Sequence, residues 1–384
     1  MTHRLRGATA IVGIGKAGLG GRPTGLSALD LMATASLNAL ADAGLELADV
    51  DGLFVSSSVH ANPTLSAAEY LGIKPRYSNG SMIGGASFVA HALTAAMALD
   101  AGLCDVALIA YGSNQRSAGG RLMSLSEPQP YEAVYKPRFP ISAYAFAAAR
   151  HMHEFGTTRA DLAEVAVAAR RWAMLNPEAA SRKPLTVEEV LAAPLVCDPL
   201  SRLDCCLVTD GGGAVVMTRA DRARDGRHPA AYLLGCAGAH SNRQIAQMED
   251  LTTTAAAESG RHAYAMAGLG PADVDVAQLY DAFTINTLLF LEDLGFCPKG
   301  EGGRFVADGA IAPGGRLPVN TNGGGLSCVH PGMYGVFLMI EAVEQLRGAA
   351  GGRQVPNAKV ALAHGNGGTL SSQVTSLFGT ADVL

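Results

Sequence analysis

The residues best suited to chemistry lie in one glycine-rich segment that runs from Asn320 to Gly335. It reads Asn-Thr-Asn-Gly-Gly-Gly-Leu-Ser-Cys-Val-His-Pro-Gly-Met-Tyr-Gly and carries Cys328, His330 and Tyr334. An unperturbed histidine titrates near neutral pH, so His330 is a candidate acid, base or hydrogen-bond donor. Three glycines in a row allow the backbone to approach a ligand closely. The segment therefore predicts a polar loop at a reactive site.

A helix is expected directly after this loop, because apolar residues then recur at helical spacing: Val336, Met339, Ile340, Val343 and Leu346. The backbone N–H groups at a helix N-terminus suit a developing negative charge. Further glycine-rich or polar loops contribute Tyr280 and His364 as candidate catalytic residues. The substrate contacts predicted in these loops are Gly85, Ser87, Asn322, Asn366 and Gly367.

Apolar strands alternate with helices along the first half of the chain. The expected strands are Ala8–Gly15, Val50–Val55 and Asp105–Tyr111, and the expected helices are Ala28–Gly44, Ala67–Leu71 and Ala86–Gly102. Tyr77–Gly85 is interpreted as a turn. Strands that are apolar on both faces and alternate with helices indicate an α/β fold with covered, largely parallel sheets.

The second half repeats the first. Ala43–Asp51 (Ala-Gly-Leu-Glu-Leu-Ala-Asp-Val-Asp) recurs as Ala267–Asp275 (Ala-Gly-Leu-Gly-Pro-Ala-Asp-Val-Asp), and Gly84–Tyr111 recurs in outline as Gly323–Ala363. Two copies of one α/β unit predict a pseudo-twofold axis. Because ligands of such sheets bind beyond the carboxyl ends of the strands, equivalent loops of both copies should converge on one site.

A long excursion interrupts the pattern at residues 113–200. It carries several prolines and expected helices at Ala143–Phe155, Ala160–Asn176 and Val187–Ala193; the prolines are Pro128, Pro130, Pro137 and Pro140. We interpret it as a region that covers the substrate. The polar stretch after residue 220 divides the chain into an N-terminal half, 1–225, which includes the excursion, and a C-terminal half, 226–384.

Composition narrows the function classes. Of 384 residues, 48% are hydrophobic and 16% are charged, so a large core can form. The net charge is −5 with no basic block, which argues against a nucleic acid or anionic membrane as partner. No apolar stretch is long enough to span a membrane. Seven cysteines without metal-ligand spacing indicate free thiols, a reducing cytoplasmic compartment and no bound metal.

Taken together, the Gly-rich His-Pro segment, the Ala363–Gly368 stretch (Ala-His-Gly-Asn-Gly-Gly), the Asp281-Ala-Phe element and the duplication resemble the thiolase superfamily. The chain is most similar to thiolases of the sterol-carrier-protein or lipid-transfer-protein type, from Thr9 to Gly379. That resemblance implies a five-layer α-β-α-β-α fold, a homodimer and acyl-CoA substrates, with no cofactor besides the CoA of the substrate. Members of this type also form complexes with a small zinc-ribbon and OB-fold protein. No lipid-carrier domain is expected after Leu384.

The chain departs from the family where thiolases carry their cysteines. The position of the nucleophilic cysteine is held by Gly85, and that of the acid/base cysteine by Ala282, while His330 matches the family histidine and Tyr280 replaces a residue that is often His. Thiolysis needs a thiolate that carries the acyl group, and glycine cannot do this. The resemblance therefore predicts retro-aldol or aldol chemistry through a thioester enolate, as in thiolase-fold aldolases of steroid side chains, on a steroid or aromatic acyl group of lipid metabolism.

The predicted roles follow from this chemistry. His330 and Tyr280 are expected to donate to the thioester oxygen. Tyr334 is the candidate base or proton donor with Tyr280 as its partner, and because a phenol has a pKa near ~10, it would need His330 or the helix N-terminus nearby. His364 is expected to act directly or to orient a neighbour. Cys328 could serve as a surrogate acid/base thiol or be an inert buried thiol.

Other interpretations remain open. Tyr280 could pack at a strand end, Tyr334 could be the first core residue of its helix, and Asp281 is expected to accept backbone hydrogen bonds. The chain could also be an acetyl-CoA acyltransferase that uses Cys328 or another thiol. A third possibility is a catalytically silent thiolase-like subunit of a complex.

Overall fold

The computed structural model describes residues 3–119, 131–224 and 226–384. The first half consists of β1 (Thr9–Ala17), α1 (Ala28–Ala43), β2 (Gly52–Val55), α2 (Pro63–Leu71), β3 (Tyr77–Asn79), α3 (Ser87–Asp100), β4 (Val106–Ser113) and β7 (Gly211–Arg219). The second half consists of β8 (Ala231–His240), α9 (Ala256–Ala267), β9 (Val276–Leu279), α10 (Thr284–Asp293), α11 (Gly302–Val306), α12 (Gly335–Leu346), β10 (Val360–Gly367) and β11 (Ser372–Gly379). The expected alternation of strands and helices is thus present.

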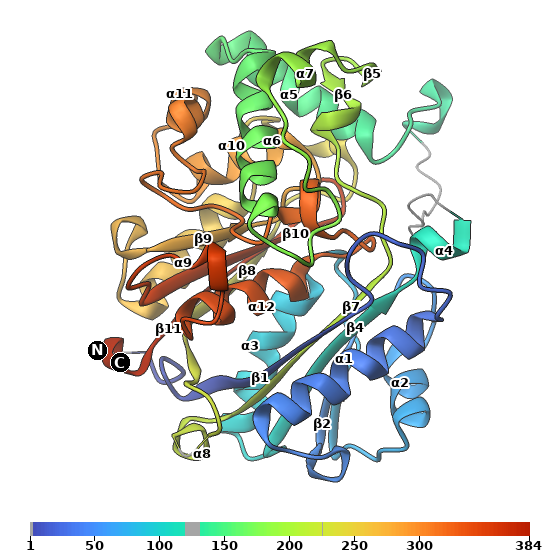
Figure 1. The fold of residues 1–384 in the computed structure, drawn as a ribbon, viewed down its shortest axis with the longest axis vertical. Helices are drawn as coiled ribbons and strands as arrows, with labels where there is room; N and C mark the ends of the chain where they lie inside the picture. Colours follow the sequence, from blue (N-terminus) through green and yellow to red (C-terminus); the bar gives the residue numbers. More distant parts are fainter. Residues whose placement is uncertain (1–2, 120–130, 225) are drawn as a thin grey trace.

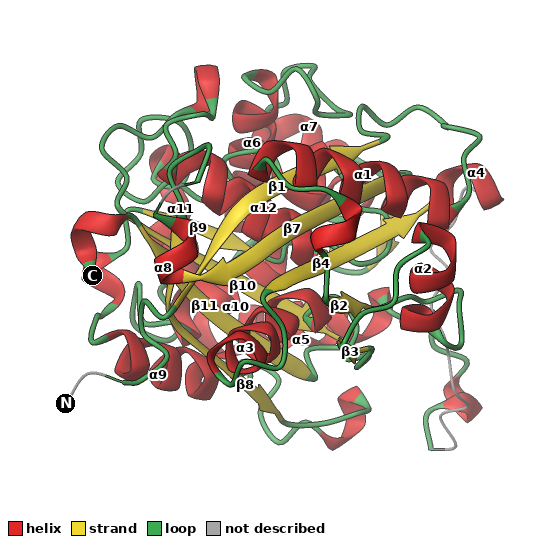
Figure 2. Cartoon of the chain, turned by 90° about the horizontal axis from the view of Figure 1, so that it is seen from below, coloured by secondary structure: helices red, strands yellow, loops and turns green. Residues whose placement is uncertain are grey.

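The strands of both halves form one mixed ladder in the order β3-β2-β4-β7-β1-β8-β11-β10-β9. The halves meet where β1 pairs with β8 over a short antiparallel register, Ala10 with Tyr232 and Ile11 with Ala231. Three pairs of neighbouring strands run parallel, β2 with β3, β2 with β4 and β9 with β10, as the helical crossovers between them require. The five other pairs of this ladder among the described residues are antiparallel, so the expectation of largely parallel sheets was wrong. Figure 2 shows these strands with helices on both sides.

Helices α3 and α12 lie between the two halves of the ladder. Each packs on strands of both halves, whereas α1 covers the outer face of β1, β4 and β7, and α9 covers the outer face of β8 and β11. In Figure 1 the two inner helices occupy the middle of the molecule. This gives the sequence of layers helix, sheet, helix, sheet, helix that was expected.

The sequence repeat is also a structural repeat. Gly44 and Gly268 end α1 and α9 in the left-handed region, at φ 71° and 66°, which favours glycine. The repeat ends on an aspartate in each half: Asp51 accepts hydrogen bonds from the first backbone N–H groups of β4, and Asp275 accepts them from those of β10. One local device therefore aligns the parallel strands in both halves.

The excursion forms a cap over the second half. It contains α4 (Gln115–Gly119), α5 (Ile141–Phe155), α6 (Arg159–Met174), α7 (Val187–Ala192), β5 (Leu195–Cys197) and β6 (Leu200–Ser201); Pro128 and Pro130 lie outside the described residues. Helices α5 and α6 pack against α10, and α6 also packs against the turn Gly324–Cys328. In Figure 1 the green segments of this cap form the upper part of the molecule.

Local signals explain where elements begin and where the expectation failed. α1 starts at a capping box in which Ser27 and Asp30 satisfy each other's backbone N–H groups. The segment expected as a turn after residue 77 begins instead with β3, because Tyr77–Asn79 pairs in parallel with β2 at the edge of the sheet. Pairing at the edge overrides the weak strand propensity of Ser78 and Asn79.

The link between α8 (Ala220–Ala223) and β8 contains the expected division between the halves, although residue 225 itself is not described. That division remains a prediction, since one continuous ladder joins the halves. Among the described residues, no helix has the length and apolar character needed to cross a membrane. In the same part of the chain, no group of three His, Cys, Asp or Glu side chains is arranged to hold a metal.

Candidate active site

Tyr280 and His330 form the centre of the convergent loops. Tyr280 directly follows β9, and its backbone N–H donates to the His364 carbonyl of β10 at 3.0 Å. Its hydroxyl lies 3.2 Å from His330 Nε2 and accepts a hydrogen bond of 3.1 Å from the backbone N–H of Tyr334, at the N-terminus of α12. The phenol is thus held between an imidazole and a helix N-terminus.

The ring of Tyr280 occupies the space in front of Gly85. A Cβ at Gly85 would lie 2.2 Å from Tyr280 Cε2 and 2.5 Å from its hydroxyl oxygen. No side chain can stand at position 85 unless Tyr280 moves. The phenol therefore takes the place to which the resemblance assigns a cysteine side chain, which links the two departures from the family.

Burial keeps both partners of this pair neutral. It raises the pKa of Tyr280 well above its ordinary value, against the opposite effect of the Tyr334 N–H. It lowers the pKa of His330 to about 4. Among the described residues no group bonds His330 Nδ1, although the backbone of His330 is fixed by Thr209 at 3.1 Å. The site therefore presents a phenol that can donate and an imidazole that can accept a proton.

Asp281 holds the glycine-rich loop. Its carboxylate accepts from the N–H groups of Gly325 at 2.7 Å and Leu326 at 3.3 Å, as expected for a residue that fixes the loop. Burial raises its pKa to about 7 against these hydrogen bonds. Gly324 (φ 64°) leaves no room for a side chain, since a Cβ would lie 2.0 Å from Asp281 Oδ2. The close approach explains the run of glycines.

Tyr334 lies beside the pair, but its hydroxyl points elsewhere. Its ring stacks on that of His330 and meets that of Tyr280 edge to face, with centroids 6.2 and 5.8 Å apart. Its hydroxyl donates to Asn322 Oδ1 at 2.9 Å, and burial raises its pKa well above the ordinary range. The predicted partnership of the two tyrosines is a contact of rings and not of hydroxyl groups. Asn322, predicted to contact the substrate, is here a buried acceptor for Tyr334.

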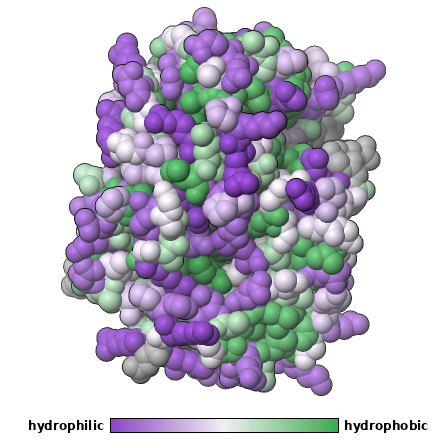
Figure 3. Space-filling model, viewed as in Figure 1, coloured by the Kyte–Doolittle hydropathy of each residue, from purple (hydrophilic) through white to green (hydrophobic). Residues whose placement is uncertain are grey.

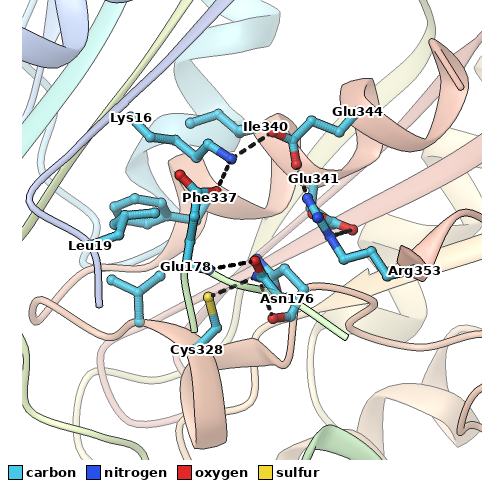
Figure 4. Close-up of a pocket in the computed structure, with 12 residues that line it drawn as sticks. Lys16, Leu19, Asn176, Glu178, Cys328, Phe337, Ile340, Glu341, Glu344 and Arg353 are labelled. Carbon is cyan, nitrogen blue, oxygen red and sulfur yellow. Dashed lines mark hydrogen bonds and ion pairs between the residues drawn. The ribbon is translucent and has the colours of Figure 1, made fainter. Parts of the chain in front are cut away.

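Cys328 faces a different group of side chains. Figure 4 shows its sulfur beside Asn176, whose amide donates to it at 3.5 Å. The same small cavity, of about 10 Å³, is lined by ion pairs that link Lys16 to Glu178 and Glu344. Burial raises the pKa of the thiol well above its ordinary value. The surroundings of Cys328 thus match those of an inert buried thiol, and its predicted acid/base role has no geometric support.

His364 belongs to a second, buried chain of hydrogen bonds. Its ring bonds Thr375 at 2.9 Å and Gln373 at 3.0 Å, and burial lowers its pKa to about 3. Gln373 then donates to Asn366 at 2.8 Å, and the Asn366 amide donates to the Tyr144 hydroxyl at 2.9 Å. The geometry suits the orienting role among those expected for His364.

The loop before α3 and the end of β10 contact each other through their backbones. A Cβ at Gly367 would lie 1.7 Å from the Ile83 carbonyl, so only glycine fits there. Ser87 donates to the Gly84 carbonyl at 2.7 Å and accepts from the Ile83 N–H at 2.9 Å. Of the predicted substrate contacts in these loops, Ser87 and Gly367 are thus engaged in shaping the loops themselves.

Two tyrosines of this region were not singled out from the sequence. Tyr144 of α5 stacks on Phe283 at 4.4 Å and donates to the Gly368 carbonyl at 3.1 Å. Tyr111 of β4 donates to the Pro331 carbonyl at 2.5 Å and accepts from the Met333 N–H at 3.2 Å. Tyr111 could have been identified from the sequence, because it lies near the carboxyl end of an apolar strand. No sequence pattern around Tyr144 points to that residue.

Comparison with known proteins gives the family and the fold. The family described as "Thiolase C-terminal domain-like" matches residues 237–380. The chain is 39% identical to the 17-hydroxy-3-oxo-4-pregnene-20-carboxyl-CoA lyase of Mycobacterium tuberculosis, over 90% of this chain and 93% of that protein. It is 35% identical to an acetyl-CoA acetyltransferase of Methanothermobacter thermautotrophicus, over 91% and 94%. The solved structure of an Ltp2-ChsH2(DUF35) aldolase superposes with a TM-score of 0.87 at 34% identity, covering 98% of both chains.

Proposed function

Because the chain belongs to the thiolase superfamily and has its fold, we propose that it is an acyl-CoA enzyme that breaks or forms a carbon–carbon bond by retro-aldol or aldol chemistry. The observation that carries this proposal is the Tyr280 phenol, which stands in front of Gly85 and bonds His330. It supports an active site that works without a covalent acyl-enzyme.

Thiolysis would need a thiolate at the reacting carbon. At position 85 there is no side chain, and the adjacent space is filled by Tyr280. Cys206 is a nearby thiol, since its backbone N–H donates to the Ala282 carbonyl at 2.8 Å, and burial raises its pKa well above the ordinary value. A buried thiol of raised pKa is a poor nucleophile, which favours the non-thiolytic route.

In the proposed cleavage, His330 Nε2 takes the proton of the β-hydroxyl group of a 3-hydroxyacyl-CoA. The Cα–Cβ bond then breaks, and its electron pair moves into the thioester to give an enolate. The Tyr280 hydroxyl donates to the enolate oxygen, strengthened by the Tyr334 N–H behind it. His330 returns the proton to Cα, so the products are a ketone or aldehyde and a shortened acyl-CoA. Tyr334, which stacks on His330, positions the imidazole.

The substrate class rests on the relatives. The mycobacterial lyase is named for a steroid carboxyl-CoA, so we assign to this chain a 3-hydroxyacyl-CoA with a bulky steroid or aromatic group at the β-carbon. No cofactor is needed besides the CoA of the substrate. The chemistry suits a cytoplasmic enzyme of lipid breakdown.

A small partner protein is part of the proposal. The related aldolase was solved together with ChsH2(DUF35), and a zinc-ribbon and OB-fold protein of that kind is the partner proposed here. The excursion offers an apolar surface for it, since Tyr131, Val134 and Tyr135 are each more than 70% exposed. Exposed Leu37, Leu65 and Tyr70 of α1 and α2 support a homodimer, and Figure 3 shows hydrophobic side chains gathered over that lower region.

A second candidate function is acetyl-CoA acyltransfer, favoured by the 35% identity to an archaeal acetyl-CoA acetyltransferase. One experiment separates the two. The protein, alone and with the co-expressed small partner, is incubated with acetyl-CoA, a 3-ketoacyl-CoA and a 3-hydroxyacyl-CoA, and analysed by mass spectrometry. We expect cleavage of the 3-hydroxyacyl-CoA to a carbonyl product without any adduct. A covalent acyl group mapped to a cysteine would overturn the proposal, and absence of turnover in every mixture would indicate a silent subunit.

A further inference from the structure

A larger cavity, of about 230 Å³, lies behind the glycine-rich loop. Its walls come from α6, the segment 181–185, residues 202–207 and the turn Gly324–Cys328. Among the described residues, those that line it are distinct from Tyr280, His330 and Tyr334. The cavity is therefore separate from the candidate reaction centre.

Two arginines, Arg170 and the exposed Arg202, line this cavity. Arg170 is held by its Nε donating to Ser327 Oγ and its Nη1 donating to the Lys183 carbonyl, both at 3.0 Å, which leaves Nη2 for another acceptor. Within the described ranges no carboxylate forms an ion pair with Arg170 or with Arg202, and no acidic residue lines the cavity. Burial lowers the pKa of Arg170, against the more distant charge of Glu189. A partly buried cation without a paired anion is costly, and a bound anion would offset that cost.

The remaining walls are apolar or hydroxylic. Leu185, Leu203, Leu207 and Leu326 form one part of the lining, which also includes Ser181 and Ser327, and the Ser327 hydroxyl is the one bonded to Arg170. The volume lies below the ~300–1,000 Å³ of pockets that enclose drug-sized ligands, so a whole acyl-CoA does not fit. Charge, walls and size together match a short molecule with one anionic end and a hydrocarbon body.

The cavity also shares a wall with the loop that holds the reaction centre. Leu326 and Ser327 belong to the turn whose N–H groups bind Asp281, and His330 follows three residues later. Leu207, which also lines the cavity, donates its N–H to the Gly325 carbonyl at 2.9 Å. The turn is therefore hydrogen-bonded to two parts of the cavity wall, through Arg170 and through Leu207. A ligand that restricts the motion of Arg170 also restricts its hydrogen-bond partner Ser327 and therefore the turn.

We propose that this cavity is a binding site for a small organic carboxylate, whose carboxylate is held by Arg170 and Arg202 and whose hydrocarbon body lies against the leucines. Guanidinium groups suit a planar carboxylate because they bind both of its oxygens. Binding there steadies the turn Gly324–Cys328. The site does not depend on the reaction assigned to the enzyme.

The test is calorimetric titration of the full chain with hexanoate, its neutral analogue hexanamide, and inorganic phosphate. We expect hexanoate to bind at one site per chain and to raise the unfolding temperature. Hexanamide and phosphate should bind at least tenfold more weakly. Arg202→Gln, at an exposed position, should weaken hexanoate binding by roughly tenfold to a hundredfold, the range for hydrogen bonds to a charged group.

The matched control is Arg171→Gln, which changes the next residue of the same helix, outside the cavity lining, and should leave the affinity unchanged. Arg170→Gln should abolish binding, but it also removes the bond to Ser327, so Arg202→Gln decides the outcome. Equal binding of hexanamide, or full affinity in Arg202→Gln, would overturn the proposal. The proposal would also be overturned if free CoA displaced hexanoate and bound more weakly to Arg202→Gln. In that case the cavity would hold the phosphate end of the acyl-CoA substrate.

Discussion

In the first half the loop before α3 contributes Gly84, Gly85 and Ala86, whereas in the second half the loop before α12 contributes His330 and Tyr334. The two loops hold equivalent places in the repeat and touch each other, since a Cβ at Gly335 would lie 2.2 Å from the Gly85 carbonyl. One loop therefore carries the candidate functional groups, and the other leaves the space that Tyr280 fills. The difference shows what a duplicated fold allows: where one half has no side chain, a side chain from the other half can fill the space.

The largest effect is expected from Tyr280→Phe, which keeps the ring in front of Gly85 but removes the hydroxyl. It tests whether the side chain that fills this space also takes part in the reaction. Loss of one preorganised donor to a developing oxyanion lowers kcat by about 10²–10³. We expect a loss of that size in cleavage of a 3-hydroxyacyl-CoA, with folding retained in circular dichroism. Tyr264→Phe is the control, because no described residue bonds the buried Tyr264 hydroxyl. Turnover of Tyr280→Phe within threefold of the parent would remove Tyr280 from the chemistry.

Restoring a cysteine tests whether space is the reason for Gly85. Gly85→Cys should lower the free energy of unfolding by ~1–3 kcal/mol, because its side chain overlaps the Tyr280 ring, and should give no thiolysis. Combining it with Tyr280→Ala should show a favourable coupling of about 0.5–3 kcal/mol in a double-mutant cycle, measured by urea unfolding. The control is Gly80→Cys, where the nearest atom to a Cβ is an ordinary 3.4 Å away. Additive effects would mean that the two positions do not compete for space.

A smaller effect is expected from the cap, which meets the second half through Tyr144. Tyr144→Phe leaves the Asn366 amide without its acceptor and the Gly368 carbonyl without its donor. We expect a stability loss of about 1 kcal/mol and a several-fold lower turnover. Tyr264→Phe, which removes a hydroxyl that no described residue bonds, should change neither. Unchanged kinetics in Tyr144→Phe would show that the network around His364 serves stability alone.

At neutral pH the smallest effect is that of the buried histidines of the two halves, which becomes visible only in acid. Burial lowers the pKa of His91 in α3 to about 4, that of His330 to about 4 and that of His364 to about 3. When the pH falls below the ordinary histidine pKa of ~6.5, these histidines bind protons in the unfolded chain but stay neutral in the folded chain. The free energy of unfolding therefore falls by at most ~1.4 kcal/mol per pH unit for each histidine.

This loss should extend from ~6.5 towards the folded values near 4 and 3. Urea unfolding at several pH values should show a shallower slope for His364→Gln than for the parent. His153→Gln, at an exposed position, serves as the control. An unchanged slope in His364→Gln would mean that His364 is protonated in the folded protein.

Much of the architecture was readable from the chain. Ser27, Asp30 and Gly44 mark the ends of α1, and the repeated Ala-Asp-Val-Asp stretch marks where β2 and β9 begin. The edge strand β3 was missed, because Tyr77–Asn79 becomes a strand only through its pairing with β2. Signals within a few residues determine turns and caps, whereas an edge strand depends on a neighbour distant in sequence.

The convergence of Tyr280, His330 and Tyr334 followed from the sequence, because the ends of parallel strands and the helices that follow them meet at one edge. Which hydroxyl faces which partner did not. Only the tertiary structure directs Tyr280 to His330, turns Tyr334 to Asn322 and Cys328 to Asn176, and brings Tyr144 from the excursion to Asn366. The sequence by itself determined the elements, the repeat and the absence of a cysteine at position 85. The packing of layers far apart along the chain decided the contacts, because side-chain direction depends on neighbours that no local pattern specifies.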